Sequence, residues 1–158
     1  MFKGNVLFTT VTIWWRLLQT KIGCQATLFR WNCQLWSSSL CQICKSESET
    51  IQHFFVSCFH KWSFWESQLV ALQLTTKFQT PESVWLSLST LHDESGELID
   101  ETILLSLGTI LEIVWRHHWM CIFDNMSWSN MLADSLHNYS LSSYLTTATK
   151  SRELIDNS

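Results

Sequence analysis

The segment CQICKSESETIQHFFVSC, residues 41–58, decides how this chain folds. Two residues separate Cys41 from Cys44, eight separate Cys44 from His53, and four separate His53 from Cys58. A two-residue gap lets both thiolates of one tight turn reach the same metal ion, and a second pair from the start of a following helix completes a tetrahedron. Four sulfur and nitrogen ligands with no open position are typical of structural Zn²⁺. We therefore predict one structural zinc ion at these four residues, whose binding energy contributes to folding.

Alternatives to this ligand set are open. Cys33 and His60 are rival ligands, and replacing Cys58 with His60 would give the less usual spacing C-x2-C-x8-H-x6-H. In a second alternative, the cysteines of the turn are free thiols and the histidine lies at the surface. The six cysteines would also be enough for three disulfides. However, four of them are scattered among expected helices, and a reducing compartment suits the pattern better.

The remaining sequence predicts an all-α fold. The chain of 158 residues has one proline and four glycines, too few for a turn-rich β fold. Apolar residues recur at helical spacing in several stretches, and Thr80 before Pro81 and Glu82 is a typical helix start. We expect helices over residues 7–18, 26–36, 55–72, 97–122 and from 128, with another beginning at Pro81. The predicted domains are a zinc-binding part over 5–75 and a helical region over 80–138, followed by a disordered tail over 139–158, which is rich in serine and threonine.

Charge is distributed unevenly along the chain. Residues 1–77 hold seven Lys and Arg against three Asp and Glu, whereas residues 78–158 hold three against eleven. The basic half contains the expected zinc site, so a nucleic-acid surface is predicted there; an ordinary imbalance is the alternative. The composition, 46% hydrophobic and 15% charged, excludes a disordered chain and suggests that a partner covers part of the surface.

No targeting or membrane segment stands out. Residues 6–18 follow Lys3 and resemble the core of a signal peptide, but three threonines interrupt them and no cleavage site follows. No apolar run reaches the length of a membrane span. We therefore expect an intracellular protein, with the nucleus as one location, and no membrane partner.

Several of these segments together carry a family resemblance. They are Trp14-Trp15-Arg16-Leu17-Leu18, residues 40–44, residues 49–55, Cys58, Trp62 and Trp65. Over about residues 5–72 the chain resembles the zinc-binding domain that lies downstream of the polymerase in LINE-type (non-LTR) retrotransposon polyproteins. The resemblance implies the same four zinc ligands and a role in gripping template RNA or target DNA.

The chain also departs from that family in two respects. Members often have Leu-Pro-Thr shortly after the first helix, where this chain has Ile22-Gly23-Cys24. In the family a polymerase precedes this helix, so the chain looks like a detached C-terminal piece of such an element or a gene predicted from one.

No enzyme site is expected. The chain has no adjacent aspartates for a polymerase, no glycine-rich phosphate loop and no G-x-S-x-G element. His117 and His118 are interpreted as residues near the C-terminal end of a helix, where histidines are common, and not as catalytic residues.

The expected function is therefore that of an accessory, non-catalytic module that binds RNA or DNA weakly. Trp31 and Trp36 are candidates for base stacking, although each is more typical of a core. Other retrotransposon proteins are further expected partners, and the oligomeric state is open. The alternatives are a protein-interaction module or a retrotransposon remnant without a selected function. The residues expected to contact phosphates are Arg16, Lys21, Arg30, Lys45 and Lys61.

Overall fold

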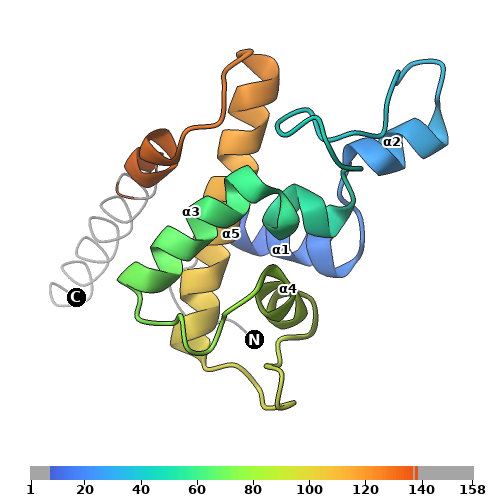
Figure 1. Ribbon diagram of the computed structural model, residues 1–158. Coiled ribbons are helices and arrows are strands. Elements are labelled where there is room, and N and C mark those ends of the chain that lie inside the picture. Colours follow the sequence, from blue (N-terminus) through green and yellow to red (C-terminus); the bar gives the residue numbers. More distant parts are fainter. Residues whose placement is uncertain (1–7, 137, 139–158) are drawn as a thin grey trace, which may run out of the picture.

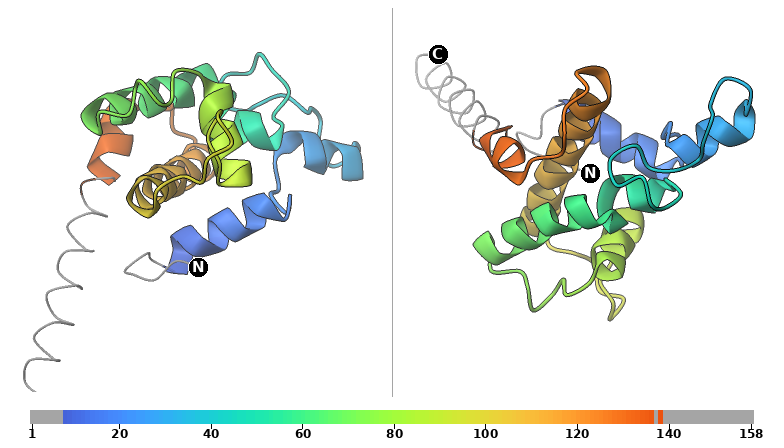
Figure 2. Two further views of the ribbon diagram at one scale, coloured as in Figure 1. Left: turned by 90° about the horizontal axis from the view of Figure 1, so that it is seen from below. Right: turned by 45° about the horizontal axis from the view of Figure 1, so that its top comes forward.

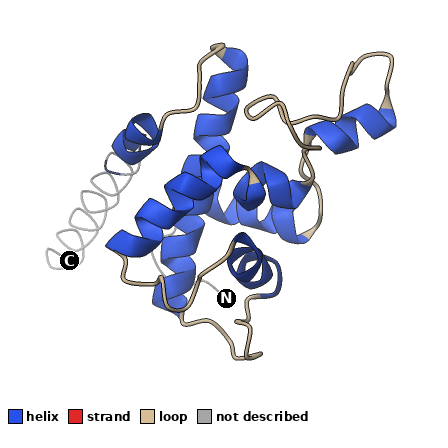
Figure 3. Ribbon diagram, viewed as in Figure 1, coloured by secondary structure: helices blue, strands red, loops and turns tan. Residues whose placement is uncertain are grey.

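The computed structural model describes residues 8–136 and 138. Within these residues the fold is all-α, as predicted, and the only β pairing consists of two isolated bridges, Leu40↔Ser48 and His92↔Leu98 (Figure 3). The helices, in chain order, are α1 (Phe8–Leu18), α2 (Gln25–Trp31), the π-helix η1 (His53–Ser57), α3 (Phe59–Ala71), α4 (Pro81–Thr90) and α5 (Glu101–Phe123). A further helical stretch covers residues 130–136.

The long helix α5 is the centre of the molecule. Helices α1 and α3 and the π-helix η1 pack against it, while α4 packs against α1 and η1 (Figure 1). Helix α2 and the loop after it extend away from this body (Figures 1 and 2). The loop returns to bring the predicted zinc-binding segment against the helices.

Helices α1 and α5 approach closely because α5 has a glycine where they meet. A Cβ atom built on Gly108 would lie 2.8 Å from Cζ3 of Trp14 and 3.0 Å from Cγ2 of Thr10. The indole Nε1 of Trp14 donates to the carbonyl of Leu88 at the end of α4, over 2.8 Å. The Thr10 hydroxyl donates to the carboxylate of Glu112, which is buried in α5. Helix α1, from the start of the chain, is therefore part of the same core as α5.

The second helix is shorter than predicted. Helix α2 ends at Trp31, whereas the sequence suggested that it continued to residue 36. The side-chain oxygen of Asn32 accepts hydrogen bonds from the amides of Gln34 and Leu35, at 3.0 and 3.2 Å. An asparagine that satisfies the following amides offers the backbone a turn in place of a helix.

The helix predicted over residues 55–72 is interrupted at Cys58, whose backbone is extended with φ −61° and ψ 126°. This break changes which side chains of the following helix face the core. Phe59 and Leu72, expected on the buried stripe, are 59% and 38% exposed. The buried residues of α3 are Lys61, Phe64, Trp65, Gln68 and Leu69.

The starts of helices α4 and α5 lie at or near the positions predicted from the sequence. Thr80 caps α4 through the amide of Ser83, and Pro81 is its first residue. Helix α5 begins at Glu101, four residues later than expected, because Asp100 caps it by accepting from the amide of Thr102. None of the helices in the described part of the chain has the length and apolar character needed to cross a membrane.

The predicted division into two regions near residues 75–80 stays a prediction, although the helices on either side of it share one core. The tail expected to be disordered, 139–158, lies outside the described residues.

The α1–α5 contact makes a prediction about Gly108→Ala. Alanine favours a helix over glycine by roughly 1 kcal/mol, but the added methyl group would press on Trp14, and overpacking costs about 1–3 kcal/mol. We expect a net loss of stability in urea unfolding. Ser106→Ala, two residues from Gly108 and therefore on a different face of α5, is the control and should change stability by less than about 0.5 kcal/mol. A Gly108→Ala protein that is more stable than the wild type would contradict the α1–α5 packing.

Candidate metal centre

The first two predicted ligands lie on a tight turn closed by backbone hydrogen bonds. The amide of Lys45 donates to the carbonyl of Cys41, and the amide of Cys41 donates to the carbonyl of Glu47, both at 2.8 Å. Lys45 has φ 57°, a left-handed conformation that lets the chain reverse directly after Cys44. The bridge Leu40↔Ser48 closes the base of the turn. Both thiols are thereby held on the same small loop.

Glu49 and Thr50, part of the family-like segment, connect this turn to two helices. The buried carboxylate of Glu49 accepts from the amide of Gln25 at 3.0 Å, and its carbonyl accepts from the amide of Ala26 at 3.2 Å. These bonds satisfy free amides at the start of α2, where negative charge is favourable. The Thr50 hydroxyl accepts from the amide of His53 at 3.1 Å and so fixes the start of the segment that carries the third ligand.

His53 and Cys58 bracket the π-helix η1. The amide of Cys58 bonds to the carbonyl of His53, five residues back, at 3.3 Å. Because the backbone then becomes extended, the carbonyls of Phe54 and Phe55 need other donors. Two side chains of α3 supply them: Nζ of Lys61 donates to Phe54 at 2.6 Å, and Nε1 of Trp65 donates to Phe55 at 2.8 Å. A π-helical turn of this kind is frequently found at a functional site.

The four predicted ligand side chains converge. The sulfurs of Cys41, Cys44 and Cys58 and a ring nitrogen of His53 all lie within 4.8 Å of one another. In a zinc site with Zn–S bonds of about 2.3 Å, ligand atoms are separated by about 3.8 Å, so small side-chain movements would close a tetrahedron. Three of the residues are buried, and Cys44 is half-buried. The three sulfurs and one nitrogen, and their arrangement, fit the ligands and the tetrahedral geometry that zinc prefers.

The histidine is oriented for this role. Its Nε2 lies 3.3 Å from the sulfur of Cys44, while its Nδ1 lies 3.3 Å from a carboxylate oxygen of Glu47. A carboxylate on the outer ring nitrogen fixes the tautomer in which Nε2 can bind a metal ion. Glu47 was not predicted from the sequence, since nothing in its spacing from His53 distinguishes it from a solvated surface residue.

Hydrogen bonds within the cluster shift the pKa values of its thiols in opposite directions. The hydrogen bond with Cys58, together with burial, raises the pKa of Cys41 to about 12, while the same hydrogen bond lowers the pKa of Cys58. Burial opposes ionisation of Cys44, but hydrogen bonds from Ser46 and nearby amides prevail and lower its pKa. A metal ion would displace the proton held between Cys41 and Cys58.

Lys61 is the buried cation beside this cluster. Its side chain is 0% exposed, and besides the Phe54 carbonyl its Nζ bonds to Nδ1 of His118 on α5 at 3.0 Å. Burial lowers its pKa, whereas the nearby charges of Cys41, Glu49 and Cys58 favour the protonated form. Three thiolates, one neutral imidazole and a divalent ion carry a net charge of −1, which an ammonium would balance.

The predicted phosphate contact at Lys61 is therefore wrong, because a fully buried side chain cannot reach a nucleic acid. The sequence did contain a signal: Lys61, Phe64, Trp65 and Gln68 fall at helical spacing on one face, which the structure buries.

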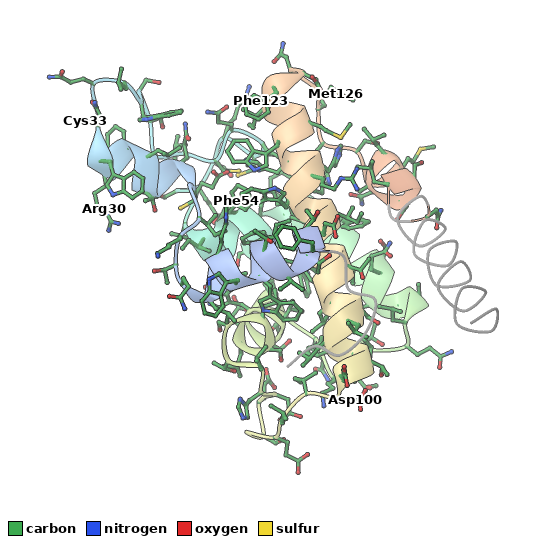
Figure 4. The ribbon with its side chains drawn as sticks, turned by 180° about the vertical axis from the view of Figure 1, so that it is seen from behind. Arg30, Cys33, Phe54, Asp100, Phe123 and Met126 are labelled. Atoms are coloured by element: carbon green, nitrogen blue, oxygen red, sulfur yellow. The ribbon has the colours of Figure 1, made fainter. Side chains whose placement is uncertain are left out.

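The rival metal ligands and the residues predicted to contact nucleic acid lie outside the four-residue cluster. Cys33 is exposed near the outer end of α2, remote from the cluster, and His60 is half-buried with its ring 3.9 Å from that of Phe59; neither belongs to the four-residue group (Figure 4). Trp31 is 72% exposed and Trp36 is half-buried. The four remaining basic candidates, all exposed, are Arg16, Lys21, Arg30 and Lys45.

Comparison with known proteins finds one similarity, in the N-terminal part of the chain. Residues 1–65 match the model of a family described as zinc-binding in reverse transcriptase. No curated protein and no solved structure matches the chain significantly. The matched residues include the turn, the π-helix and all four clustered side chains. Residues 1–65, less than half of the chain, are therefore similar to the zinc-binding domains found in reverse transcriptases.

Proposed function

We propose that Cys41, Cys44, His53 and Cys58 bind one structural Zn²⁺ ion. The observation that carries this proposal is the convergence of three sulfurs and one imidazole nitrogen within 4.8 Å, on a chain whose residues 1–65 match a zinc-binding family. Four protein ligands leave no position for a substrate or a water molecule, which is the character of a structural site. When bound, zinc would keep the thiolates deprotonated and tie the turn to η1 and α3.

We further propose that the zinc-organised part is an accessory module that binds RNA or DNA without catalysis. The exposed cations Arg16, Arg30 and Lys45 come from α1, α2 and the metal-binding turn, and Lys21 follows α1. A few cations of this kind support weak binding to phosphates without recognition of sequence. The corresponding role in a retrotransposon is to hold template RNA or target DNA beside a polymerase.

The histidines of α5 support the non-catalytic interpretation. His117 and His118 are 0% and 2% exposed. Nε2 of His117 accepts from the amide of Ser129 at 3.0 Å, and Nδ1 of His118 bonds to Lys61. Burial lowers the pKa of both, that of His118 to about 2, so both are neutral core residues. Neither is placed to exchange a proton with a substrate.

A protein-interaction module is the second candidate, favoured by one observation. Phe8, Val11, Trp15 and Leu18 fall at helical spacing on α1, and their side chains are between 37% and 86% exposed. A continuous apolar stripe on a helix surface is typical of a contact with another protein. This candidate stands if the chain binds no nucleic acid at low salt.

The zinc proposal predicts which residues retain the metal. Purified protein should hold one zinc ion per chain. Cys41→Ser, Cys44→Ser, His53→Ala and Cys58→Ser should each abolish it, because three ligands bind far more weakly than four. The matched controls Cys24→Ser, Cys33→Ser, Cys121→Ser and His60→Ala should retain it, as measured by elemental analysis. Absence of zinc from the wild type, or its loss in His60→Ala and retention in Cys58→Ser, would contradict the proposed ligand set.

The nucleic-acid proposal predicts a shallow salt dependence. With three or four phosphate contacts, the slope of log affinity against log salt should be about −2 to −4. Arg16→Gln and Arg30→Gln should each weaken binding to all sequences alike and reduce the slope by about 1. Lys77→Gln is the control, since its ammonium is paired with Asp93 at 2.9 Å. Fluorescence anisotropy of the full chain with single-stranded RNA and DNA tests this, and no binding at low salt would overturn the proposal.

A further inference from the structure

An open groove lies between the metal-binding turn and the segment that follows α5. Its volume is about 650 Å³, and Gln42 and Lys45 of the turn line one side together with His60 of α3. The other side is lined by Asn125, Ser127 and Trp128. The turn lies beside the C-terminal end of α5 in Figure 1, and Met126, which also lines the groove, is labelled there in Figure 4. The groove thus joins residues about 80 positions apart in the sequence, on one side of the metal centre.

The groove lacks acidic residues on a chain that is acidic overall. No aspartate or glutamate is among the described residues that line it, although the chain has 14 Asp and Glu against 10 Lys and Arg. Lys45 is an exposed cation, and neutral hydrogen-bond donors, including Gln42 and Ser127, also line the groove. A phosphate group could enter this space without meeting a carboxylate.

The far wall provides an aromatic ring in a fixed position. Nε1 of Trp128 donates to the side-chain oxygen of Asn130 at 2.9 Å, and the ring centroid of His117 lies 4.4 Å from that of Trp128. His117 is itself held by the amide of Ser129. A ring fixed in this way loses little conformational entropy when a flat ligand packs against it.

We propose that this groove binds one nucleotide unit of a single-stranded nucleic acid. The phosphate would face Lys45 and His60, and the base would face Trp128 and Asn125, because the groove has a cationic wall opposite an aromatic and amide wall. Its volume suits a ligand of nucleotide size, and stacking on an aromatic ring requires an unpaired base. This inference rests on the proposed nucleic-acid function and assigns it a surface.

The test introduces a carboxylate into the groove of the zinc-loaded full chain. Ser127→Glu places a negative charge on an exposed loop residue of the far wall, and Ser135→Glu, exposed on the last helical stretch, makes the same charge change away from the groove. Anisotropy with a ten-nucleotide oligouridylate should show at least about fivefold weaker binding for Ser127→Glu and less than about twofold for Ser135→Glu. Lys45→Gln should weaken binding by a similar factor to Ser127→Glu, and circular dichroism should show that each variant remains folded.

Cross-linking provides a second, direct measurement. An oligouridylate carrying 4-thiouridine should cross-link to peptides containing residues 40–45 and 121–128. Wild-type binding with equal effects of Ser127→Glu and Ser135→Glu, or cross-links confined to α1 and α2, would overturn the groove and leave the nucleic-acid function standing. An oligonucleotide that does not bind the wild type at all would overturn both.

Discussion

The hydrogen bond from buried Lys61 to the carbonyl of Phe54 joins the metal-binding side of the molecule to its core. Phe54 follows the ligand His53 directly, and its ring packs against His118 and Trp115 of α5, with centroids 4.1 and 5.5 Å away. The same lysine bonds to His118 and lies within electrostatic reach of the cluster thiols. A buried ammonium needs compensating negative charge. Zinc-bound thiolates would provide it, so the metal centre and the α5 core depend on each other.

Much of the fold was predictable because it follows from local chemistry. The cap at Thr80 with Pro81, the long apolar pattern that became α5, and the turn with Cys41 and Cys44 all depend on residues close together in the sequence. The spacing of the cysteines and the histidine also predicted the four side chains that converge in the structure.

The sequence predictions failed where contacts between residues far apart in the chain determine the structure. Cys58 was placed inside one continuous helix, but its extended backbone ends η1 and changes the buried face of α3. Lys61 was expected to contact phosphates, whereas hydrogen-bond partners on η1 and α5 hold its side chain inside the protein. Glu47 gains its role only when the chain folds back to place it 3.3 Å from His53. No sequence pattern reports contacts of this kind, because they depend on how separate elements pack.

The central claim is that metal binding and the packing of α5 form one cooperative unit, and hydrogen exchange with and without a zinc chelator tests it most directly. Once zinc is removed, the thiolates would take up protons, so Lys61 would lose its counter-charge, and the constraint on η1 would be lost as well. We expect amide protection to fall both in residues 51–57 and in the part of α5 that contacts them, residues 113–119. Loss of protection confined to residues 41–58, with α5 as protected as in the zinc-loaded protein, would contradict this account.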